Sequence, residues 1–402
     1  MKDKFPLFFR KYNSKDIVYF DMASCSLVPE KVMDKLVDFT FNSNAKPSGG
    51  GHFISEEAIS EVELVRNAVM NFINAETNSK LFFTPNATHA FKQIAEYFAS
   101  QIINENDIIL ISPLEHNSNY LPWLKLADSK GAKVQFCKLD ENNCIDIDSI
   151  PFDDPHLKLI SVTHVSHVTG EIQDVKEVIT RAKVKNIPVI VDGAQAAAHI
   201  PIDVRELGAS FYVFSGYKMY GMPGCGLCYA SSEATNLMLD FNNESGGSEN
   251  SERDASVEEC SFQQSNCLWE LGMLNTPNIV SMSAAINFID SYNINHLSQE
   301  KKDIINALFK GLSQIKDIQL FSRPDNNVGI ISFQHQHIHS YDISIFLSNH
   351  GICVKAGDLS STPFMQHVQK NIVKENMLVS VSIGCFNTLS DVDSLLEAIN
   401  SL

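Results

Sequence analysis

The sequence predicts an α/β protein with a large domain built on a mainly parallel sheet and a smaller α+β domain. Up to Asn275, short apolar runs rich in β-branched residues alternate with stretches of helical spacing. This alternation is typical of a parallel sheet that helices cover on both faces. With 402 residues, 44% of them apolar and 20% charged, the chain is long enough for more than one domain with a buried core.

Six short runs are the candidate strands of the large domain. They are Leu81–Thr84, Ile108–Ser112, Leu159–Thr163, Val189–Asp192, Phe211–Ser215 and Gly226–Ala230. Between the first two, apolar residues recur at helical spacing at Ala87, Ala90, Phe91, Ile94, Ala95 and Phe98. Val175–Val184 is a second helical stretch, and the polar Gly/Ser-rich segment Asn242–Ser256 is the most loop-like part of the chain.

After Asn275 the pattern changes to that of a smaller α+β domain. We expect helices at Ile279–Tyr292, Glu300–Ile315, Ser340–His350 and from Ser390, and strands at Val328–Phe333, Ile352–Lys355 and Met377–Ile383. We therefore predict a large domain over residues 15–275, and a small domain formed by residues 1–14 and 276–402.

Composition excludes several classes of partner. The 31 basic and 48 acidic residues give a net charge of −17, and no basic stripe is visible, which argues against nucleic acid and anionic membrane surfaces. No apolar stretch reaches membrane-spanning length, and the first residues lack the apolar run of a signal peptide. The nine scattered cysteines favour reduced thiols, so we expect a cytoplasmic protein.

Chemically useful side chains follow the ends of five predicted strands, where open α/β sheets bind ligands. After Thr84 comes a helix whose N-terminus is suited to phosphate. The other four are followed by Glu115-His116, by His164 and His167, by Asp192-Gly193-Ala194-Gln195, and by Ser215-Gly216-Tyr217-Lys218. Singly, most such residues are caps, structural histidines or solvated amines. Together they suggest a cofactor with a phosphate, a ring nitrogen that needs a carboxylate and a carbonyl that needs an amine, as in pyridoxal phosphate.

Longer motifs carry a family resemblance. IVDGAQAAAHIPIDV (190–204), SFYVFSGYKMYGMPGCG (210–226), LFFTPNATHAFKQIA (81–95) and VTHVSHVTG (162–170) resemble the class V aminotransferase family, in particular its cysteine desulfurase and selenocysteine lyase branch. The resemblance implies a fold type I pyridoxal 5'-phosphate enzyme with an amine or amino-acid substrate. It also implies a homodimer with the active site at the subunit interface.

The resemblance also assigns roles to residues. Lys218 would form the Schiff base and move the Cα proton, with Asp192 pairing with the pyridinium nitrogen, His116 stacking on the ring and Gln195 bonding its phenolic oxygen. Thr88 and Ser215, with the helix N-terminus, would hold the phosphate. Further positions implied near the cofactor or the substrate are Ala87, His167, Tyr217, Thr276 (reaching across the dimer) and His52.

Two departures from the family pattern bear on the reaction. Ser360 stands where a desulfurase carries its nucleophilic cysteine, and Ser380 stands where the family has a carboxylate-binding arginine. Lys355 offers a point charge to a carboxylate instead. We therefore expect a transaminase, or else a lyase or epimerase, that acts in a biosynthetic pathway and is not a cysteine desulfurase. A non-catalytic scaffold or binding protein is the alternative.

Two further clusters favour structural roles. Cys225 and Cys228 are three residues apart on a predicted strand, so their side chains point to opposite faces, and we interpret them as packing residues. The alternating His335, His337 and His339 are interpreted as an exposed strand end. We predict no metal site.

Overall fold

A computed structural model describes residues 1–47, 50–245, 269–270, 272–368 and 377–402. Its main element is a seven-stranded sheet of order β4-β10-β9-β8-β7-β5-β6. The strands are β4 (Lys80–Thr84), β5 (Ile108–Ile111), β6 (Lys133–Phe136), β7 (Leu157–Thr163), β8 (Val189–Asp192), β9 (Phe211–Ser215) and β10 (Gly226–Ala230). Only β10 runs against its neighbours in this sheet. The predicted α/β fold with a mainly parallel sheet is confirmed.

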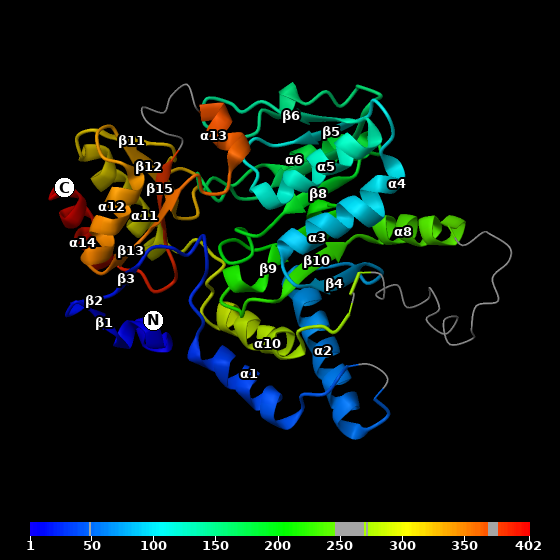
Figure 1. The fold of residues 1–402 in the computed structure, drawn as a ribbon, viewed down its shortest axis with the longest axis horizontal. Coiled ribbons are helices and arrows are strands. Elements are labelled where there is room, and N and C mark those ends of the chain that lie inside the picture. Colours follow the sequence, from blue (N-terminus) through cyan, green and yellow to red (C-terminus); the bar gives the residue numbers. More distant parts are fainter. Residues whose placement is uncertain (48–49, 246–268, 271, 369–376) are drawn as a thin grey trace.

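Helices cover both faces of this sheet. Successive strand residues point to opposite sides, so strands that are apolar throughout present an apolar surface on each face. Phe82 belongs to one apolar core, whereas its neighbours Leu81 and Phe83 belong to the other. The Phe82 side is covered by α3 (Ala87–Gln93), a π-helical turn (Ile94–Ala99), α4 (Ser100–Ile102), α5 (Leu121–Lys130) and α8 (Ser232–Ser245). The other side is covered by α1 (Glu30–Asn42), α2 (Phe53–Phe72), α6 (Val175–Val184), α7 (Val204–Leu207) and α10 (Thr276–Ser291), as Figure 1 shows for α1, α2 and α10.

The smaller part lies beside the large sheet, on the left in Figure 1, where both termini are also found. Its antiparallel sheet has the order β11 (Ile318–Leu320), β12 (Ile330–His335), β15 (Leu378–Ser382) and β14 (Lys355–Gly357). Its helices are α11 (Gln299–Gln314), α12 (Ser340–Asn349), α13 (Thr362–Val368) and α14 (Leu389–Asn400). β13 (Ile352–Cys353) pairs in parallel with β3 (Val18–Tyr19), and β1 (Lys11–Tyr12) pairs with β2 (Lys15–Asp16).

The predicted elements agree with the structure most closely where the apolar pattern is strongest. β9, β10 and α6 begin and end at the predicted residues, whereas β6, β11 and helices α1, α2, α5 and α8 were not identified from the sequence. The helical pattern after Ala87 contains a π-helical turn. Of the loop-like segment, residues 242–245 end α8 and residues 246–256 lie outside the described residues. The domain boundary at residue 276 stays a prediction, and α10, which follows it, packs on α1 and α2.

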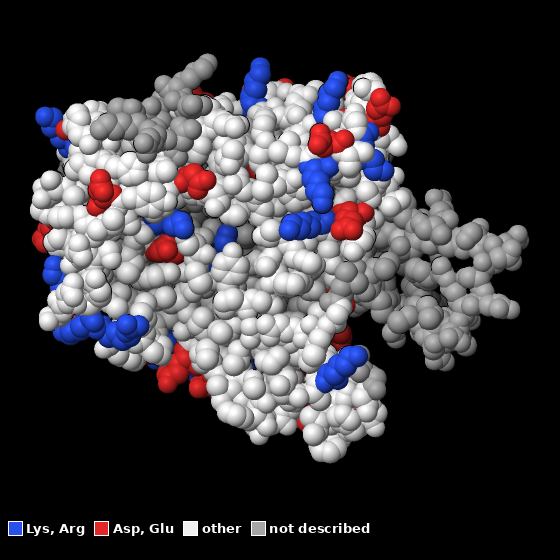
Figure 2. Space-filling view, viewed as in Figure 1, with Lys and Arg blue, Asp and Glu red and all other residues white. Residues whose placement is uncertain are grey.

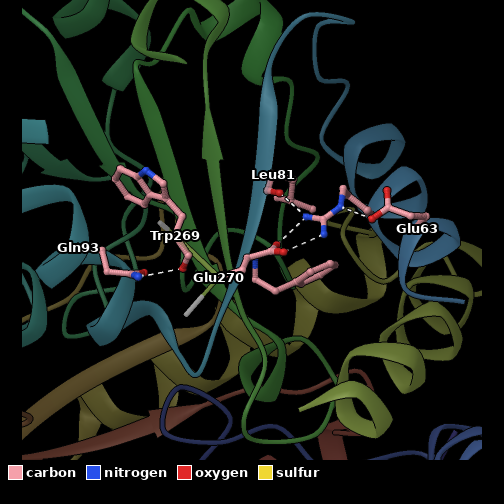
Figure 3. A network of polar contacts seen from close by, with 7 residues as sticks. Glu63, Leu81, Gln93, Trp269 and Glu270 are labelled. Atoms are coloured by element: carbon pink, nitrogen blue, oxygen red, sulfur yellow. Dashed lines mark hydrogen bonds and ion pairs between the residues drawn. The ribbon is translucent and has the colours of Figure 1, made fainter. Parts of the chain in front are cut away.

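A network of polar contacts ties α2 to the edge of the large sheet (Figure 3). The Arg66 guanidinium donates to both carboxylate oxygens of Glu270, at 2.8 and 3.1 Å, and also to the Leu81 carbonyl of β4. Glu270 in turn accepts the Phe83 backbone N–H at 2.8 Å. No described helix is long and apolar enough to cross a membrane.

Candidate active site

A cavity of about 190 Å³ lies where the carboxyl ends of the large-sheet strands meet the smaller part of the molecule. In Figure 2 a hollow near the middle of the visible face has basic atoms inside it. Seven residues predicted for the site line the cavity: His116, His167, Tyr217, Lys218, Lys355, Ser360 and Ser380. Ala23, Ser24 and Leu359 complete the lining. The structure thus brings together residues from both ends of the chain and from its middle.

Lys218 and Asp192 are two ionisable residues of the site that attract each other electrostatically. Asp192 ends β8, is only 5% exposed, and accepts the Ala194 backbone N–H through Oδ1 at 2.9 Å. Among the described residues its Oδ2 accepts no hydrogen bond. Burial raises the pKa of Asp192 and lowers that of Lys218, and each group opposes the other's shift by attraction. The Lys218 amine is therefore easier to deprotonate than an exposed lysine.

The backbone next to Asp192 is packed too tightly for a side chain. A Cβ on Gly193 would lie 2.0 Å from the ring of Tyr212, and Gly193 donates its N–H to the Val213 carbonyl at 2.8 Å. Glycine at this position therefore lets β8 and β9 approach each other at their carboxyl ends. This close approach holds the Asp192 and Lys218 segments in register.

An N-terminal segment fixes the loop that carries Lys218. Ser26 donates both its N–H, at 2.9 Å, and its hydroxyl, at 2.8 Å, to the Tyr217 carbonyl, and its Oγ accepts the Tyr220 N–H at 2.7 Å. Gln195 donates its side-chain amide to the Ala23 carbonyl at 2.7 Å. Ser24, Cys25 and Ser26 were not identified as site residues from the sequence. No local motif signals them, because their partners are some 190 positions away.

A buried polar network fixes Glu115, the residue before His116. Glu115 is fully buried and accepts the Thr163 N–H and the Asn119 amide, both at 2.6 Å. Burial, reinforced by Asp192, raises the pKa of Glu115 well above its ordinary value. Asn119 also accepts the indole N–H of Trp123 at 3.0 Å. This network positions the residue that precedes His116 without exposing any charge to the cavity.

The His116 ring itself is neutral near pH 7. Its Nδ1 accepts the Ser118 N–H at 3.1 Å, which leaves Nε2 for a ligand. Burial, with the nearby Lys218, lowers the pKa of His116 to about 4. The His167 ring lies 5.0 Å from it, centroid to centroid, and burial also lowers the pKa of His167 well below its usual range. An uncharged aromatic wall on this side suits a flat ring better than an imidazolium would.

The loop that carries Ser360 has an unusual backbone. Leu359 and Ser360 have φ values of 52° and 56°, in the left-handed region that residues with a Cβ rarely adopt. The loop is held by a hydrogen bond of 3.0 Å between His167 Nε2 and the Leu359 carbonyl, and by the Asn117 N–H, which donates to the Ser360 carbonyl at 2.7 Å. These contacts keep Ser360 at the cavity wall.

Lys355 and Ser380 face each other across the smaller sheet. They are direct partners in the antiparallel pairing of β14 with β15, so their side chains lie on the same face. Ser380 is 3% exposed, lines the cavity, and its hydroxyl makes no hydrogen bond within the described part of the chain. A hydroxyl that lines a cavity and has no such bond is available to a ligand as both donor and acceptor. This pair is suited to an anionic group such as a carboxylate.

The predicted phosphate residues meet at the N-terminus of α3. The Ala87 N–H donates to the Ser215 Oγ at 2.9 Å, which joins the ends of β4 and β9. Asn86 caps the helix by accepting the His89 N–H at 2.9 Å, and Thr88 is exposed beside it. Burial raises the pKa of the Tyr217 phenol, so this side chain stays neutral and can donate a hydrogen bond. The arrangement offers hydroxyl donors from Tyr217 and Ser215 near the start of α3.

Other predicted residues lie outside the cavity lining. His52 is exposed and caps α2 by accepting the Ser55 N–H at 3.3 Å, and Thr276 is buried at the start of α10. Cys225 and Cys228 are both buried. The Nδ1 of His335 accepts the His337 N–H at 3.1 Å. No cluster of three potential metal ligands was found among the described residues.

Comparison with known proteins places this geometry in a family. The model of the family described as Aminotransferase class-V matches residues 18–395. Cysteine desulfurases from Yersinia pestis bv. Antiqua (strain Angola) and Yersinia pseudotuberculosis serotype O:3 (strain YPIII) are each 31% identical over 399 residues, which cover 99% of this chain and 96% of each relative.

Solved structures agree with the sequence relatives. The cysteine desulfurase CsdA from Escherichia coli superimposes with a TM-score of 0.82 at 26% identity, covering 96% of this chain and 94% of that one. The apo cysteine desulfurase from Thermococcus onnurineus NA1 has a TM-score of 0.85 at 24% identity, covering 100% and 96%, and supports the fold. The fold type I prediction is confirmed.

These relatives correct the expected reaction. The departures at Ser360 and Ser380 led to the expectation of a transaminase, lyase or epimerase that is not a cysteine desulfurase, with a scaffold protein as the alternative. That expectation is wrong, because curated relatives similar over the full chain are cysteine desulfurases. The error came from judging the reaction by two positions, although the similarity extends over 399 residues.

Proposed function

Because this chain belongs to the class V aminotransferase family and is a pyridoxal 5'-phosphate enzyme, we propose that it removes sulfur from cysteine or a closely related thiol amino acid. The observation that carries the proposal is a cavity lined by Lys218, next to the buried carboxylate of Asp192, in a chain that matches cysteine desulfurases end to end. When bound, the cofactor supplies an electron-accepting ring conjugated to a carbonyl group.

The residues present fit this cofactor. Within the described residues, one oxygen of the buried Asp192 carboxylate has no hydrogen-bond partner, as a ring nitrogen requires, and the α3 N-terminus with Ser215 offers donors for phosphate. We assign the amine that binds the carbonyl to Lys218, the ring stacking to His116 and the phenolic oxygen contact to Gln195. Thr88, Tyr217 and His167 would add phosphate and ring contacts.

Substrate binding would use the smaller sheet. Lys355 supplies a positive charge, and Ser380 supplies a hydroxyl that has no hydrogen-bond partner among the described residues. Both lie on the same face of β14 and β15, so we assign the α-carboxylate to them. A lysine gives a carboxylate less orientation than an arginine, because it binds as a point charge rather than as a bidentate fork. Lys218, once released from the carbonyl, is the base within the cavity that can take the α-proton.

We also propose that the enzyme is a cytoplasmic homodimer. An exposed free thiol such as Cys25 persists best in a reducing compartment. Helices α1 and α2 expose large apolar side chains, which are Met33, Val37, Phe41, Phe53 and Leu64. A surface of this kind is suited to a second copy of the chain.

Lys218→Ala tests the proposal. The purified wild type with pyridoxal phosphate should show the visible absorption of a lysine-bound cofactor and should form alanine from cysteine. The variant should lose that absorption and at least about three orders of magnitude in rate, because the amine that binds the carbonyl and moves the α-proton is gone. Circular dichroism should show an intact fold. Equal alanine formation by the variant would contradict the assignment.

A further inference from the structure

We infer that Cys25 is the thiol that accepts the substrate's sulfur and carries it as a persulfide, an inference that rests on the proposed function. The loop position where the family resemblance places such a thiol is Ser360, whose hydroxyl cannot hold sulfur in this way. A desulfurase with this sequence therefore needs a thiol from elsewhere, and the fold brings one to the cavity.

Cys25 lies in the N-terminal segment that forms part of the cavity wall. Its neighbours Ala23 and Ser24 line the cavity, and its Sγ is 3.9 Å from the carbonyl oxygen of Tyr217, the residue before Lys218. Cys25 and the Lys218 amine also influence each other's pKa through their charges. The thiol therefore lies against the loop that carries Lys218, next to residues that line the cavity.

Cys25 differs from the other described cysteines in exposure. Cys137, Cys225 and Cys228 are buried, whereas Cys144, Cys353 and Cys385 are partly exposed. Cys25 is exposed, so its sulfur is accessible to an acceptor that collects it. Among the described cysteines, the most exposed one therefore also lies against the loop that carries Lys218.

A separate feature of the cavity points to a bound ligand. Ser380 is 3% exposed and lines the cavity, and its hydroxyl makes no hydrogen bond within the described chain. Lys355 stands opposite it on the same face of the sheet. Ser24 lines the same cavity. The charge of Asp21 raises the pKa of Cys25, and the charge of Lys355 lowers the pKa of Asp21. A substrate whose carboxylate binds Lys355 and Ser380 therefore lies in the cavity beside Cys25.

The sulfur transfer balances without an external oxidant. The Cys25 thiolate attacks the substrate's sulfur, an S–S bond forms, and the substrate's Cβ–S bond breaks with its electron pair going to carbon. That carbon takes up a proton, so one thiol and one cysteine give one persulfide and one alanine. The attacking group must be a thiolate. Burial, reinforced by Asp21, raises the pKa of the Cys25 thiol, and the positive charge of Lys218 opposes this rise only in part.

The test follows alanine and sulfur separately in the holoenzyme. Wild type, Cys25→Ser, Cys25→Ala and the matched control Cys353→Ser are each mixed with cysteine, alkylated and analysed by peptide mass spectrometry. We expect the wild type and Cys353→Ser to form alanine and to carry one extra sulfur atom on the Cys25 peptide. Both Cys25 variants should bind cofactor normally and fall below about one hundredth of the wild-type rate.

A labelling experiment gives a readout that needs no turnover. The product alanine, added to the wild-type holoenzyme, should slow alkylation of Cys25 by iodoacetamide several-fold and leave Cys353 unaffected. Alanine formation with the extra sulfur on another residue, or with full rate in Cys25→Ser, would overturn the inference and leave the proposed function standing. A wild-type holoenzyme that forms no alanine would overturn both.

Discussion

His164 illustrates how burial sets the charge of a single side chain near the site. Its Nδ1 is hydrogen-bonded to the Tyr212 hydroxyl at 2.8 Å, and burial lowers the pKa of His164 to about 4. In an unfolded chain the pKa is 6.5. Between these two values the unfolded state binds a proton that the folded state does not, so acid favours unfolding.

A pH series should reveal this cost. As pH falls from 7 to 4, the free energy of unfolding of the wild type should drop by up to about 3 kcal/mol more than that of His164→Gln. Urea unfolding at each pH measures the difference. Glu171 acts in the opposite direction, because burial raises its pKa to about 7, so its contribution to stability is lost as pH rises from 4.5 to 7. Glu171 is present in both proteins and its effect cancels. Parallel pH curves would contradict the burial argument.

The identity of the main site residues was the most predictable part of the site. Lys218, Asp192 and His116 were chosen from strand-end positions and motifs, and the structure places all three at the carboxyl end of the large sheet. Their chemistry is local, since each follows a strand whose apolar run is evident in the sequence. The charge states were not predictable, because they depend on burial by residues distant in sequence.

At the scale of elements, the Arg66–Glu270 pair joins α2 to β4 (Figure 3). Their side chains are only 12% and 10% exposed, whereas those of the Lys176–Glu206 pair between α6 and α7 are 54% and 63% exposed. Removing one partner of a buried pair leaves an unpaired charge in a poorly solvated place, but exposed pairs contribute little.

Two alanine variants compare these pairs. Glu270→Ala should lower the free energy of unfolding by about 3–5 kcal/mol, and Glu206→Ala by no more than about 1 kcal/mol. Urea denaturation of the two proteins under the same conditions provides the measurement. Glu270→Gln should fall between them, since it keeps one acceptor oxygen for Arg66. Similar losses for Glu270→Ala and Glu206→Ala would show that the network does not hold α2 to the sheet.

Elements with a regular apolar pattern were predicted well, and the others were not. All five residues of β9 are buried, and its bounds were predicted correctly, because a strand inside a parallel sheet is apolar on both faces. β6 has no fully buried residue, so it has no such pattern and was missed. α1 was missed for a similar reason, because only Val32 and Phe39 of its residues are buried.

The proposed dimer belongs to the scale of the whole molecule. Phe41 on α1 is 82% exposed, and we expect a second copy to cover it. Phe41→Asp should raise the dimer dissociation constant at least about tenfold, because it places a charge in the interface. Phe9, 72% exposed in the N-terminal segment, gives the matched control Phe9→Asp. Sedimentation velocity over a range of concentrations measures both. Equal masses for both variants and the wild type would place the interface elsewhere.

The sequence by itself determined the fold class, the cofactor and the residues at strand ends, because each depends on short-range pattern. The reaction was misjudged for a physical reason. Lys355 and Ser380 come to lie on one face only through the register of β14 and β15. Ala23 and Ser24 join the cavity, and Cys25 comes to lie beside it, only because Ser26 and Gln195 tie their segment to the Lys218 loop and the end of β8. Only the tertiary structure decides such contacts, since they join residues that are far apart along the chain and share no local pattern.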